Sequence, residues 1–512
     1  WIPNLAIPVR VGARVQNLMT LPKEIQEVLQ KLESAGFEAF VVGGCVRDLL
    51  RKTIHGEPVE PKDWDITTSA KPEQIQEVFL DSFYENKFGT VGVKTGSEDE
   101  SLKIIEITTY RIESKYSDKR HPDEIKFAKD IDEDLKRRDF TVNALAMDKD
   151  GKIKDLFGGQ KDLKNKLIRA VGEPDERFEE DALRLLRAIR LAIELDFDIE
   201  DKTFAAIKEK SELIKMIAAE RIHDELLKII QHMPWPARRS LGEGGQKGKK
   251  HSNEVTEEEL SRGPARAFEL MRETGLLKNI LPEFEDGYRV GQNKHHIYTV
   301  WEHNLRAFTY AVKENFNIYV RLGALFHDLA KPHTKKGDGP DSTFYGHDVV
   351  GAKMTKQIMN RLKFSKEDTE KVVLLVRYHL FQSDPEKITD SAVRRVLRNV
   401  GKNSIWDLID VRLCDRIGSG VPKAEPYRLR KFLVMLEKAL REPISLKELK
   451  INGNELMELL AIQPGPRIGF ILNALMNEIL EDPAKNEKDH LKDRAKELNG
   501  MSDTELKKFS DE

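Results

Sequence analysis

Two carboxylates one residue apart are the first feature of this sequence that could do chemistry. Asp63 and Asp65 flank Trp64 and lead into the β-branched residues 66–67. If this segment is a strand, both acids project from the same face, because strand side chains alternate. Neighbouring carboxylates repel each other, and a divalent cation such as Mg²⁺ makes their proximity tolerable. An Asp-x-Asp pair alone is more often a solvated strand edge, so its interpretation depends on its surroundings.

A glycine turn earlier in the chain supplies a second feature. Gly43 and Gly44 follow a strand expected over residues 38–42 and precede a helix-like segment that contains Arg47. Glycine lets a backbone approach a phosphate closely, and a helix N-terminus adds amides and a positive dipole end. A glycine pair is usually just a turn. The order strand, glycine turn, helix and strand, ending in the two carboxylates, predicts a Mg²⁺–triphosphate site.

Two later segments could complete such a site. Glu106 lies in the strand-like run 102–109 and fits equally well as a third metal carboxylate or as the solvent face of a half-buried strand. The cations at 136–138 include Arg138, and arginine is suited to multidentate phosphate contact. Asp139 and Asn143 are four residues apart, so on a helix they would brace each other or an arginine.

The most informative helix is expected over residues 179–190. Asp181, Arg184, Arg187 and Arg190 recur every three residues and so form one charged stripe. A solvated helix flank would look similar, but three arginines facing one way repel unless an anion such as a triphosphate or an RNA backbone lies against them. Asp181 and Arg184 also pair an acceptor with donors, the groups that read a base edge.

Histidines gather in the C-terminal half. His303, His327, Asp328 and Asp415 combine imidazole and carboxylate in helical surroundings, which suits a transition-metal or Mg²⁺ site with a hydrolytic water. A single histidine in a helix is usually just packed. The adjacent His327 and Asp328 lie inside the apolar run 322–329, where burying both without a partner would be costly.

The elements that must position these residues differ along the chain. Two helices and several strands in the N-terminal part predict a mixed sheet, and the chain becomes wholly helical after Gly172. At 512 residues, two to four domains are expected. We expect an N-terminal extension (1–21), an α/β head (22–165), a helical neck (166–231), a flexible Gly-, Pro- and charge-rich insertion (232–262), a helical body (263–420) and a helical tail (421–512). The basic segments of the tail are as well explained by solvation as by RNA contact.

Composition restricts the class of protein. Lys and Arg number 85 against 88 Asp and Glu, so a nucleic-acid partner would require clustered rather than excess basic residues. The two cysteines, Cys45 and Cys414, are far apart and suggest a reducing compartment. No apolar run is long enough to span a membrane and no signal peptide opens the chain, so we expect a cytoplasmic protein without a membrane partner. The sequence does not set the oligomeric state.

Taken together, the motifs resemble the class II tRNA nucleotidyltransferase (CCA-adding enzyme) and poly(A) polymerase family. The resemblance covers residues 22–230 and 265–495 and is carried by the motifs at 43–48, 63–65, 137–144 and 180–184. It implies an α+β, multidomain fold in which a polymerase-β-like head with a mixed sheet precedes an all-α neck, body and tail. The chain departs from the family in the 232–262 insertion and in a polar loop at 52–62.

The resemblance also implies roles for single residues. Asp63 and Asp65 would hold Mg²⁺ and, with Arg138, carry the catalysis. Asp181 and Arg184 would read the incoming base, and Arg187 and Arg190 would lie near the triphosphate. The remaining nucleotide-binding candidates are Gly43, Gly44, Arg47, Arg138, Asp139 and Asn143.

The activity implied is addition of CCA to tRNA 3′ ends from CTP and ATP, without a nucleic-acid template and with release of pyrophosphate. A-only addition and poly(A) synthesis share these motifs and remain alternatives. The region around His303, His327, Asp328 and Asp415 resembles an HD phosphohydrolase domain, which would bind a second divalent metal and add, or supply instead, a hydrolase activity. A non-catalytic RNA-binding protein is disfavoured by the intact Asp-x-Asp pair and arginine stripe. The leading hypothesis requires the 43–65 and 180–190 segments to face one cleft.

Overall fold

The computed structural model describes residues 21–84, 89–114, 124–128, 130–233, 254–293, 296–381, 387–420 and 427–511. Residues 1–20 of the expected extension and 234–253 of the expected insertion therefore lie outside the described part. The chain divides into two compact units. The first comprises residues 1–234 and 266–282, and the second comprises residues 235–265 and 283–512.

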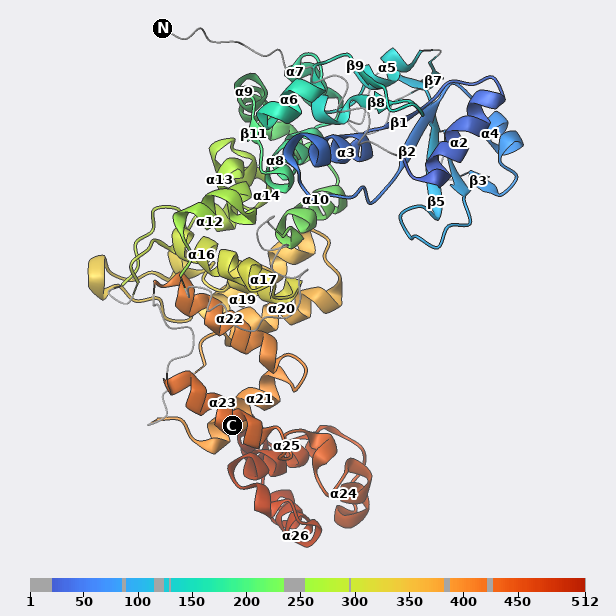
Figure 1. Cartoon of the computed structure of the whole chain (residues 1–512). Helices are drawn as coiled ribbons and strands as arrows, with labels where there is room; N and C mark the ends of the chain where they lie inside the picture. The colour runs from blue at the N-terminus through green and yellow to red at the C-terminus, as the bar shows by residue number, and fades with distance from the viewer. Residues whose placement is uncertain are drawn as a thin grey trace, which may run out of the picture. The chain divides into compact units, whose positions relative to one another are not determined.

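A seven-stranded mixed sheet forms the base of the first unit (Figure 1). Its strand order is β3-β4-β5-β2-β1-β8-β9, with β2 and β5 parallel and the other neighbours antiparallel. This confirms the expected α+β class. The strands are β1 (Ala39–Val42), β2 (Asp65–Thr68), β3 (Ser82–Tyr84), β4 (Thr90–Lys94), β5 (Ile104–Thr109), β8 (Leu145–Met147) and β9 (Ile153–Asp155), and the separate pairs are β6 (Arg111–Ser114) with β7 (Glu124–Phe127) and β10 (Leu167–Ile168) with β11 (Asp198–Ile199).

Helices cover the sheet and continue the first unit beyond it. Helix α2 (Lys23–Ser34) buries Ile25, Val28, Leu29 and Leu32, the spacing expected of an amphipathic helix. Helix α3 packs on β1 and β8, while α2 and α4 pack together. The helices are α3 (Gly44–His55), α4 (Pro72–Val78), α5 (Ile131–Lys136), η1 (Thr141–Asn143), α6 (Gly159–Asn165), α7 (Pro174–Glu180), α8 (Leu183–Leu195), α9 (Asp201–Lys210), η2 (Ser211–Met216), α10 (Ala219–Gln231), α13 (Pro264–Glu273) and α14 (Leu276–Ile280).

The prediction of a single helix over residues 179–190 is wrong. Helix α7 ends at Glu180, Asp181 has the extended angles φ −139° and ψ 103°, and α8 begins at Leu183. The Asp181 carboxylate accepts a hydrogen bond from the Leu183 backbone N–H at 3.0 Å. Such a local side-chain bond competes with the helical ladder, which is why acids at this position start helices and interrupt them. The preceding strand β10 is short, with only two residues.

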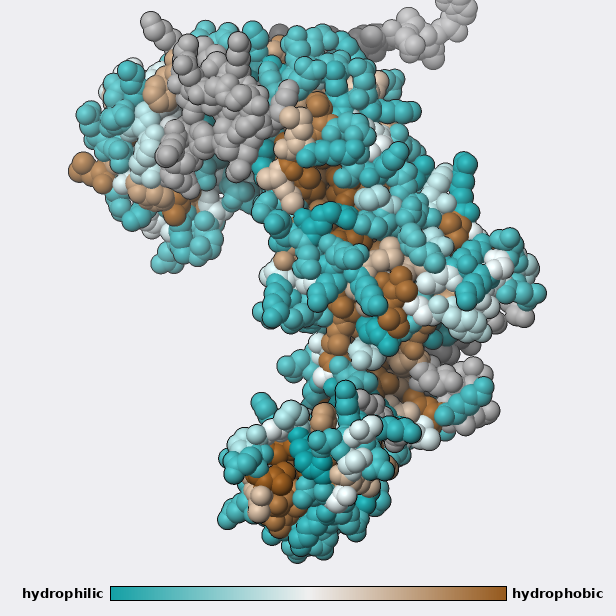
Figure 2. Space-filling view, turned by 180° about the vertical axis from the view of Figure 1, so that it is seen from behind, coloured by the Kyte–Doolittle hydropathy of each residue, from teal (hydrophilic) through white to brown (hydrophobic). Residues whose placement is uncertain are grey.

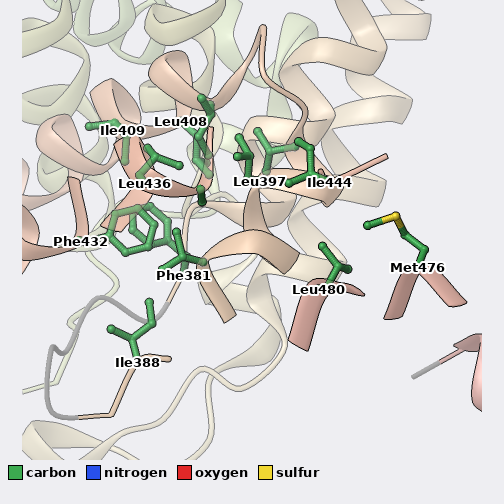
Figure 3. Close-up of a cluster of buried hydrophobic side chains, with 14 of the residues drawn as sticks. Phe381, Ile388, Leu397, Leu408, Ile409, Phe432, Leu436, Ile444, Met476 and Leu480 are labelled. Atoms are coloured by element: carbon green, nitrogen blue, oxygen red, sulfur yellow. The ribbon is translucent and has the colours of Figure 1, made fainter. Parts of the chain in front are cut away.

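Helices alone make up the regular structure of the described second unit. Its helices form a buried apolar cluster around Phe381, Leu397, Leu408, Phe432 and Leu436 (Figure 3). The elements are α12 (Glu257–Arg262), α15 (Pro282–Glu285), α16 (Val300–Lys313), α17 (Ile318–Phe326), α18 (Lys331–Thr334), η3 (Gly339–Asp341), α19 (His347–Arg361), α20 (Lys366–Tyr378), α21 (Asp390–Val400), α22 (Ile405–Gly418), α23 (Tyr427–Ala439), η4 (Leu446–Glu448), α24 (Gly453–Leu460), α25 (Pro466–Glu481), η5 (Pro483–Lys485), α26 (Lys488–Asn499) and α27 (Asp503–Asp511).

The end of the expected flexible insertion is ordered. Helix α12 lies at residues 257–262, where no structure was expected, and a capping box between Thr256 and Glu259 starts it. Val255 is buried, and its carbonyl accepts a hydrogen bond from Arg306 at 2.9 Å. The capping signal is local, but the contact that holds this segment comes from a helix far along the chain.

Polar side chains dominate the face shown in Figure 2, and apolar colour is confined to separate patches. Among the described residues, no helix combines the length and the apolar character needed to cross a bilayer. Cys45 and Cys414 are both buried free thiols.

Candidate functional site

The glycine turn joins β1 directly to α3. Gly43 has φ +83°, a conformation that a side chain would strain. A Cβ at this position would lie 3.0 Å from Nη1 of Arg138 and 3.8 Å from Oδ2 of Asp65. Glycine at 43 therefore lets an arginine and a carboxylate come up to the backbone. Three of the predicted site residues, far apart in sequence, meet here.

The carboxylates lie at the start of β2, with one departure from expectation. The strand begins at Asp65, so Asp63 precedes it and its position is not set by strand alternation. Glu106 pairs in register with Asp65 on the parallel neighbour β5, which brings both side chains to one face of the sheet. Burial raises the pKa of Asp65, Arg138 opposes the shift, and the charge of Asp63 adds to it. A hard cation beside Asp65 would neutralise the charges of Asp65 and Asp63.

A chain of hydrogen bonds links the glycine-turn helix to the arginines of α8. Arg47 donates to the Asn143 side chain at 2.8 Å, and Asn143 donates to Asp139 at 3.4 Å. Asp139 in turn accepts from Nη2 of Arg187 at 2.6 Å. Burial would raise the pKa of Asp139, but Arg187 opposes this and the pKa is lowered to about 2. The 43–65 and 180–190 segments are thus connected through buried polar contacts.

Each arginine of the expected stripe has an anionic partner within the protein. Arg184 contacts Glu180 at 2.7 Å, Arg187 contacts Asp139, and Arg190 contacts Glu225 at 2.5 Å. The expectation that these arginines need an external anion is therefore wrong as a general statement. Protein carboxylates already offset their mutual repulsion, and any phosphate would add to an existing network.

Asp181 is separated from the stripe by the break between α7 and α8. Its carboxylate receives two hydrogen bonds from Arg221 of α10, at 3.2 and 2.9 Å. Arg184 donates instead to the backbone carbonyls of Arg137 and Arg177, both at 3.1 Å. The sequence reasoning missed Arg221 and Glu225, although both lie on one face of the strongly amphipathic helix α10. Only that helical pattern hinted at a buried charged role.

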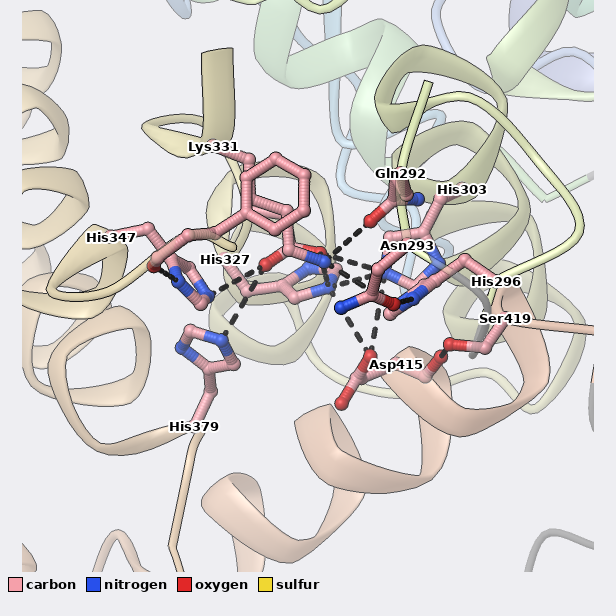
Figure 4. Close-up of polar contacts among 12 residues, drawn as sticks. Gln292, Asn293, His296, His303, His327, Lys331, His347, His379, Asp415 and Ser419 are labelled. Atoms are coloured by element: carbon pink, nitrogen blue, oxygen red, sulfur yellow. Dashed lines mark hydrogen bonds and ion pairs between the residues drawn. The ribbon is translucent and has the colours of Figure 1, made fainter. Parts of the chain in front are cut away.

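The second unit brings together the predicted His303, His327, Asp328 and Asp415, which we call the histidine–aspartate cluster (Figure 4). His303 Nε2 lies 2.8 Å from His327 Nε2, 3.1 Å from Asp328 Oδ2 and 3.4 Å from Asp415 Oδ1. His303 and His327 are fully buried and Asp328 is 1% exposed. Burial lowers the pKa of His327, but Asp328 and Asp415 more than offset this and raise it to about 9.

Side chains outside the predicted set also join this cluster. His296 lies beside His303, and the buried Lys331 ammonium contacts Asp328 at 2.5 Å. His347 and His379 approach Asp328 from α19 and the end of α20. The Gly-His-Asp and Tyr-His segments at 346–348 and 378–379 were visible in the sequence, but nothing in their spacing predicted convergence on Asp328.

Comparison with known proteins agrees with this geometry. The Poly A polymerase head domain matches residues 39–169, the probable RNA and SrmB-binding site of polymerase A matches residues 196–237, and the putative tRNA nucleotidyltransferase domain 2 matches residues 348–495. The first match lies in the first unit, and so does the second up to residue 234. The third falls within the helical second unit and includes His379 and Asp415.

Individual relatives match part of this chain or nearly all of it. The CCA-adding enzyme of Lactobacillus helveticus (strain DPC 4571) is 53% identical over 204 residues, which are 40% of this chain and 48% of that protein. The CCA-adding enzyme of Ligilactobacillus salivarius (strain UCC118) is 33% identical over 492 residues, which are 94% of this chain and 98% of that protein. The crystal structure of the Bacillus stearothermophilus CCA-adding enzyme in complex with CTP superimposes with a TM-score of 0.60 at 25% identity, covering 93% of this chain and 97% of that one. The chain therefore belongs to the CCA-adding enzyme family of class II nucleotidyltransferases.

Proposed function

We propose that this chain adds C, C and A to the 3′ end of tRNA, taking the nucleotides from CTP and ATP without a nucleic-acid template. The observation that carries the proposal is the convergence of Gly43, Asp65 and Arg138 at the end of β1, in a chain aligned over 94% of its length with a CCA-adding enzyme. In this proposal the head (22–165) and neck (166–231) carry catalysis, and the body (263–420) and tail (421–512) hold the tRNA.

The carboxylates of the first unit fit a divalent metal. Asp63 and Asp65 would hold it, with Glu106 on the neighbouring strand as a third oxygen donor. Burial and the nearby Asp63 raise the pKa of Asp65, which means that its charged form is disfavoured. A bound cation would favour the charged form again. Mg²⁺ bound here would make the attacking 3′-hydroxyl more acidic and neutralise charge on the phosphates.

The arginines then position and stabilise the triphosphate. Arg138 lies against the Gly43 turn, where a phosphate could approach the backbone. Arg47 and Arg187 are fixed by Asn143 and Asp139, so little side-chain entropy is lost when they contact phosphate oxygens. These cations would take up charge as pyrophosphate leaves.

Base selection is proposed for Asp181 and Arg184. Arg221 fixes the Asp181 carboxylate and Glu180 fixes Arg184, so acceptor and donors are held by separate partners. A base edge would contact oxygens of Asp181 and N–H groups of Arg184 without a nucleic-acid template.

Incubation with defined tRNA ends tests the proposal. A tRNA ending at the discriminator base is given labelled CTP alone, and a tRNA ending in CC is given labelled ATP alone. We expect incorporation in both cases with Mg²⁺ present, and C incorporation excludes A-only addition and poly(A) synthesis. Asp63→Ala should abolish both reactions, whereas Asp99→Ala, in an exposed turn, should leave them unchanged. Incorporation by the Asp63→Ala protein would show that the site is wrongly assigned.

A second activity, metal-dependent phosphoester hydrolysis, is favoured by the histidine–aspartate cluster. Two buried imidazoles and two carboxylates lie within about 4 Å of one another here, and together they are a donor set that suits a divalent transition metal. A transition metal held by His303, His327, Asp328 and Asp415 would activate a water for hydrolysis. We expect a phosphatase activity that survives Asp63→Ala and is lost in Asp328→Ala, with CCA addition showing the opposite pattern. Phosphatase activity that persists in Asp328→Ala contradicts this assignment.

A further inference from the structure

We propose that Glu57 is a positioning residue of the nucleotide site, because it ties the loop that carries Asp63 to the side chain of Arg47. The proposal rests on the proposed function and deepens it, since Asp63 is the proposed metal ligand and Arg47 a proposed phosphate ligand. It gives a role to the polar loop at 52–62, which has no part in the mechanism above.

The position of Asp63 depends on this loop because no strand holds the residue. Strand β2 begins at Asp65, and residues 56–62 form neither helix nor strand. Asp63 itself is exposed, whereas the next residue, Trp64, is buried and anchors the segment on the strand side. The contacts that hold the loop therefore decide where the Asp63 carboxylate lies.

Four alternating charges run from the loop to the helix that follows the glycine turn. Glu57 forms an ion pair with Arg51, and Arg51 contacts Asp48 at 3.3 Å. Asp48 accepts hydrogen bonds from Arg47 on both carboxylate oxygens, at 2.9 and 3.0 Å. None of the four side chains is more than 16% exposed, so salt screens these contacts weakly. We call these four residues the charge ladder.

Glu57 decides how the charge of Asp48 is divided between two arginines. Oδ1 of Asp48 accepts from Nε of Arg47 and from Nη1 of Arg51. While Glu57 neutralises Arg51, Asp48 is left to hold Arg47. Without Glu57, the full charge of Arg51 would act on the shared oxygen and draw Asp48 away from Arg47. Arg47 would then lose its alignment with Asn143, to which it donates at 2.8 Å.

The loop is stiff enough to carry a displacement of Glu57 to Asp63. Pro58 and Pro61 fix their own φ angles and favour an extended conformation for the residue before each of them, and Glu57 is one of these. The Val59 N–H donates to the Glu57 carbonyl at 2.8 Å, which closes a tight turn inside the loop. Pro61 is buried. Loss of the Glu57 ion pair would therefore shift Asp63 as well as Arg47.

A second ion pair on the same loop provides the comparison. Lys52 contacts Glu60, but the two side chains are 50% and 71% exposed. An exposed pair contributes little, because water and salt screen it and because ordering two long side chains costs entropy. The Lys52 pair starts one residue after Arg51 and ends three residues after Glu57. The two pairs thus differ in burial and in the link to Asp48.

Calorimetric titration of the full-length protein with CTP and Mg²⁺ tests the proposal, and tRNA is left out so that no nucleotide is transferred. We expect the Kd for CTP to rise about tenfold in Glu57→Gln, together with the Mg²⁺ concentration that gives half-maximal CTP binding. Glu60→Gln is the matched control and should keep both values. In turnover with tRNA, the KM for CTP and the KM for ATP should rise alike in Glu57→Gln, while the KM for tRNA stays constant.

The outcomes separate positioning from a purely structural role. Partial unfolding lowers the number of CTP sites per chain but not the affinity of the sites that remain. Fewer sites with an unchanged Kd in Glu57→Gln would therefore overturn the proposal, and so would an equal rise of the Kd in Glu60→Gln. If the unaltered protein does not bind CTP, the proposed function fails and this proposal fails with it.

A second variant decides the matter if Glu57→Gln fails to fold. Glu57→Asp keeps the charge but shortens the side chain by one methylene, so the loop must move to keep contact with Arg51. A severalfold rise of the Kd for CTP supports the proposal. An unchanged Kd in this variant contradicts it, while normal CTP binding by the unaltered protein would leave the proposed function standing.

Discussion

The buried pair between Asp139 and Arg187 gives a stability prediction whose size follows from the structure. Asp139 is 10% exposed and Arg187 is 33% exposed, and the carboxylate has a pKa of about 2. Relative to about 3.9 in an unfolded chain, this pKa corresponds to about 2.5 kcal/mol of stabilisation at neutral pH. Because the folded pKa is lowered, the contribution is present above about pH 4 and is lost as the pH falls towards 2.

Arg187→Met leaves the Asp139 charge buried without its cation. The expected loss is about 3–5 kcal/mol, the usual cost of breaking a buried pair from one side. Asp139→Asn should cost less, about 1–2 kcal/mol, because Arg187 is partly exposed and Glu225 lies 4.0 Å from it. The double variant leaves no buried unpaired charge and should cost no more than Arg187→Met alone. The resulting coupling energy is about 2 kcal/mol.

Hydrogen exchange read by mass spectrometry localises the effect. Peptides from α8 should exchange about 150- to 5,000-fold faster in Arg187→Met, which is the loss of about 3–5 kcal/mol expressed as a rate, whereas peptides from α16 in the second unit serve as an unchanged reference. At pH 3 the difference between the unaltered protein and Asp139→Asn should shrink. If the two single-variant losses simply add in the double variant, Asp139 and Arg187 do not stabilise each other and the reasoning is refuted.

Three further predictions concern single positions. Gly43→Ala should slow C and A incorporation alike by about tenfold, because a Cβ at this position would meet Arg138. Gly36→Ala is the control: Gly36 also has a positive φ, but a Cβ there would have nothing within 4 Å, so incorporation should not slow, and equal effects of the two variants would refute the role of the Arg138 contact. Gly418→Ala places a Cβ 2.7 Å from the His303 carbonyl and should displace His303. Binding of added Co²⁺ at the histidine–aspartate cluster should therefore fall while CCA addition stays constant, and full retention of Co²⁺ binding would contradict this. Burial raises the pKa of Asp410 to about 6, so Asp410→Asn should stabilise the second unit by about 2 kcal/mol at pH 7.5, and this gain should vanish towards pH 4. Hydrogen exchange of α22 peptides measures the gain, and a gain that does not change with pH would contradict the raised pKa of Asp410.

The fold class could be predicted because its signals are local. Helix α2 follows the apolar spacing of its residues, and β1 follows the short run before Gly43. Helix boundaries that depend on a single side chain were harder to predict. The Asp181 carboxylate ends the pattern of one helix and starts another by bonding to the Leu183 N–H, and a three-residue charge repeat gives no sign of this. The ordered end of the insertion was missed for a related reason, since Arg306 holds it from elsewhere in the chain.

The sequence by itself determined which residue types are available for chemistry. The contiguous motifs are the glycine turn, the paired carboxylates and the adjacent His327 and Asp328, and their chemistry follows from their neighbours along the chain. Only the tertiary structure decided which partners they have. Arg221 reaches Asp181 across 40 residues, and His347 and His379 reach Asp328 from different helices. Such convergence depends on helix packing over long loops, whose closure leaves no periodic signal in the sequence, so the partners of each charge had to be observed rather than predicted.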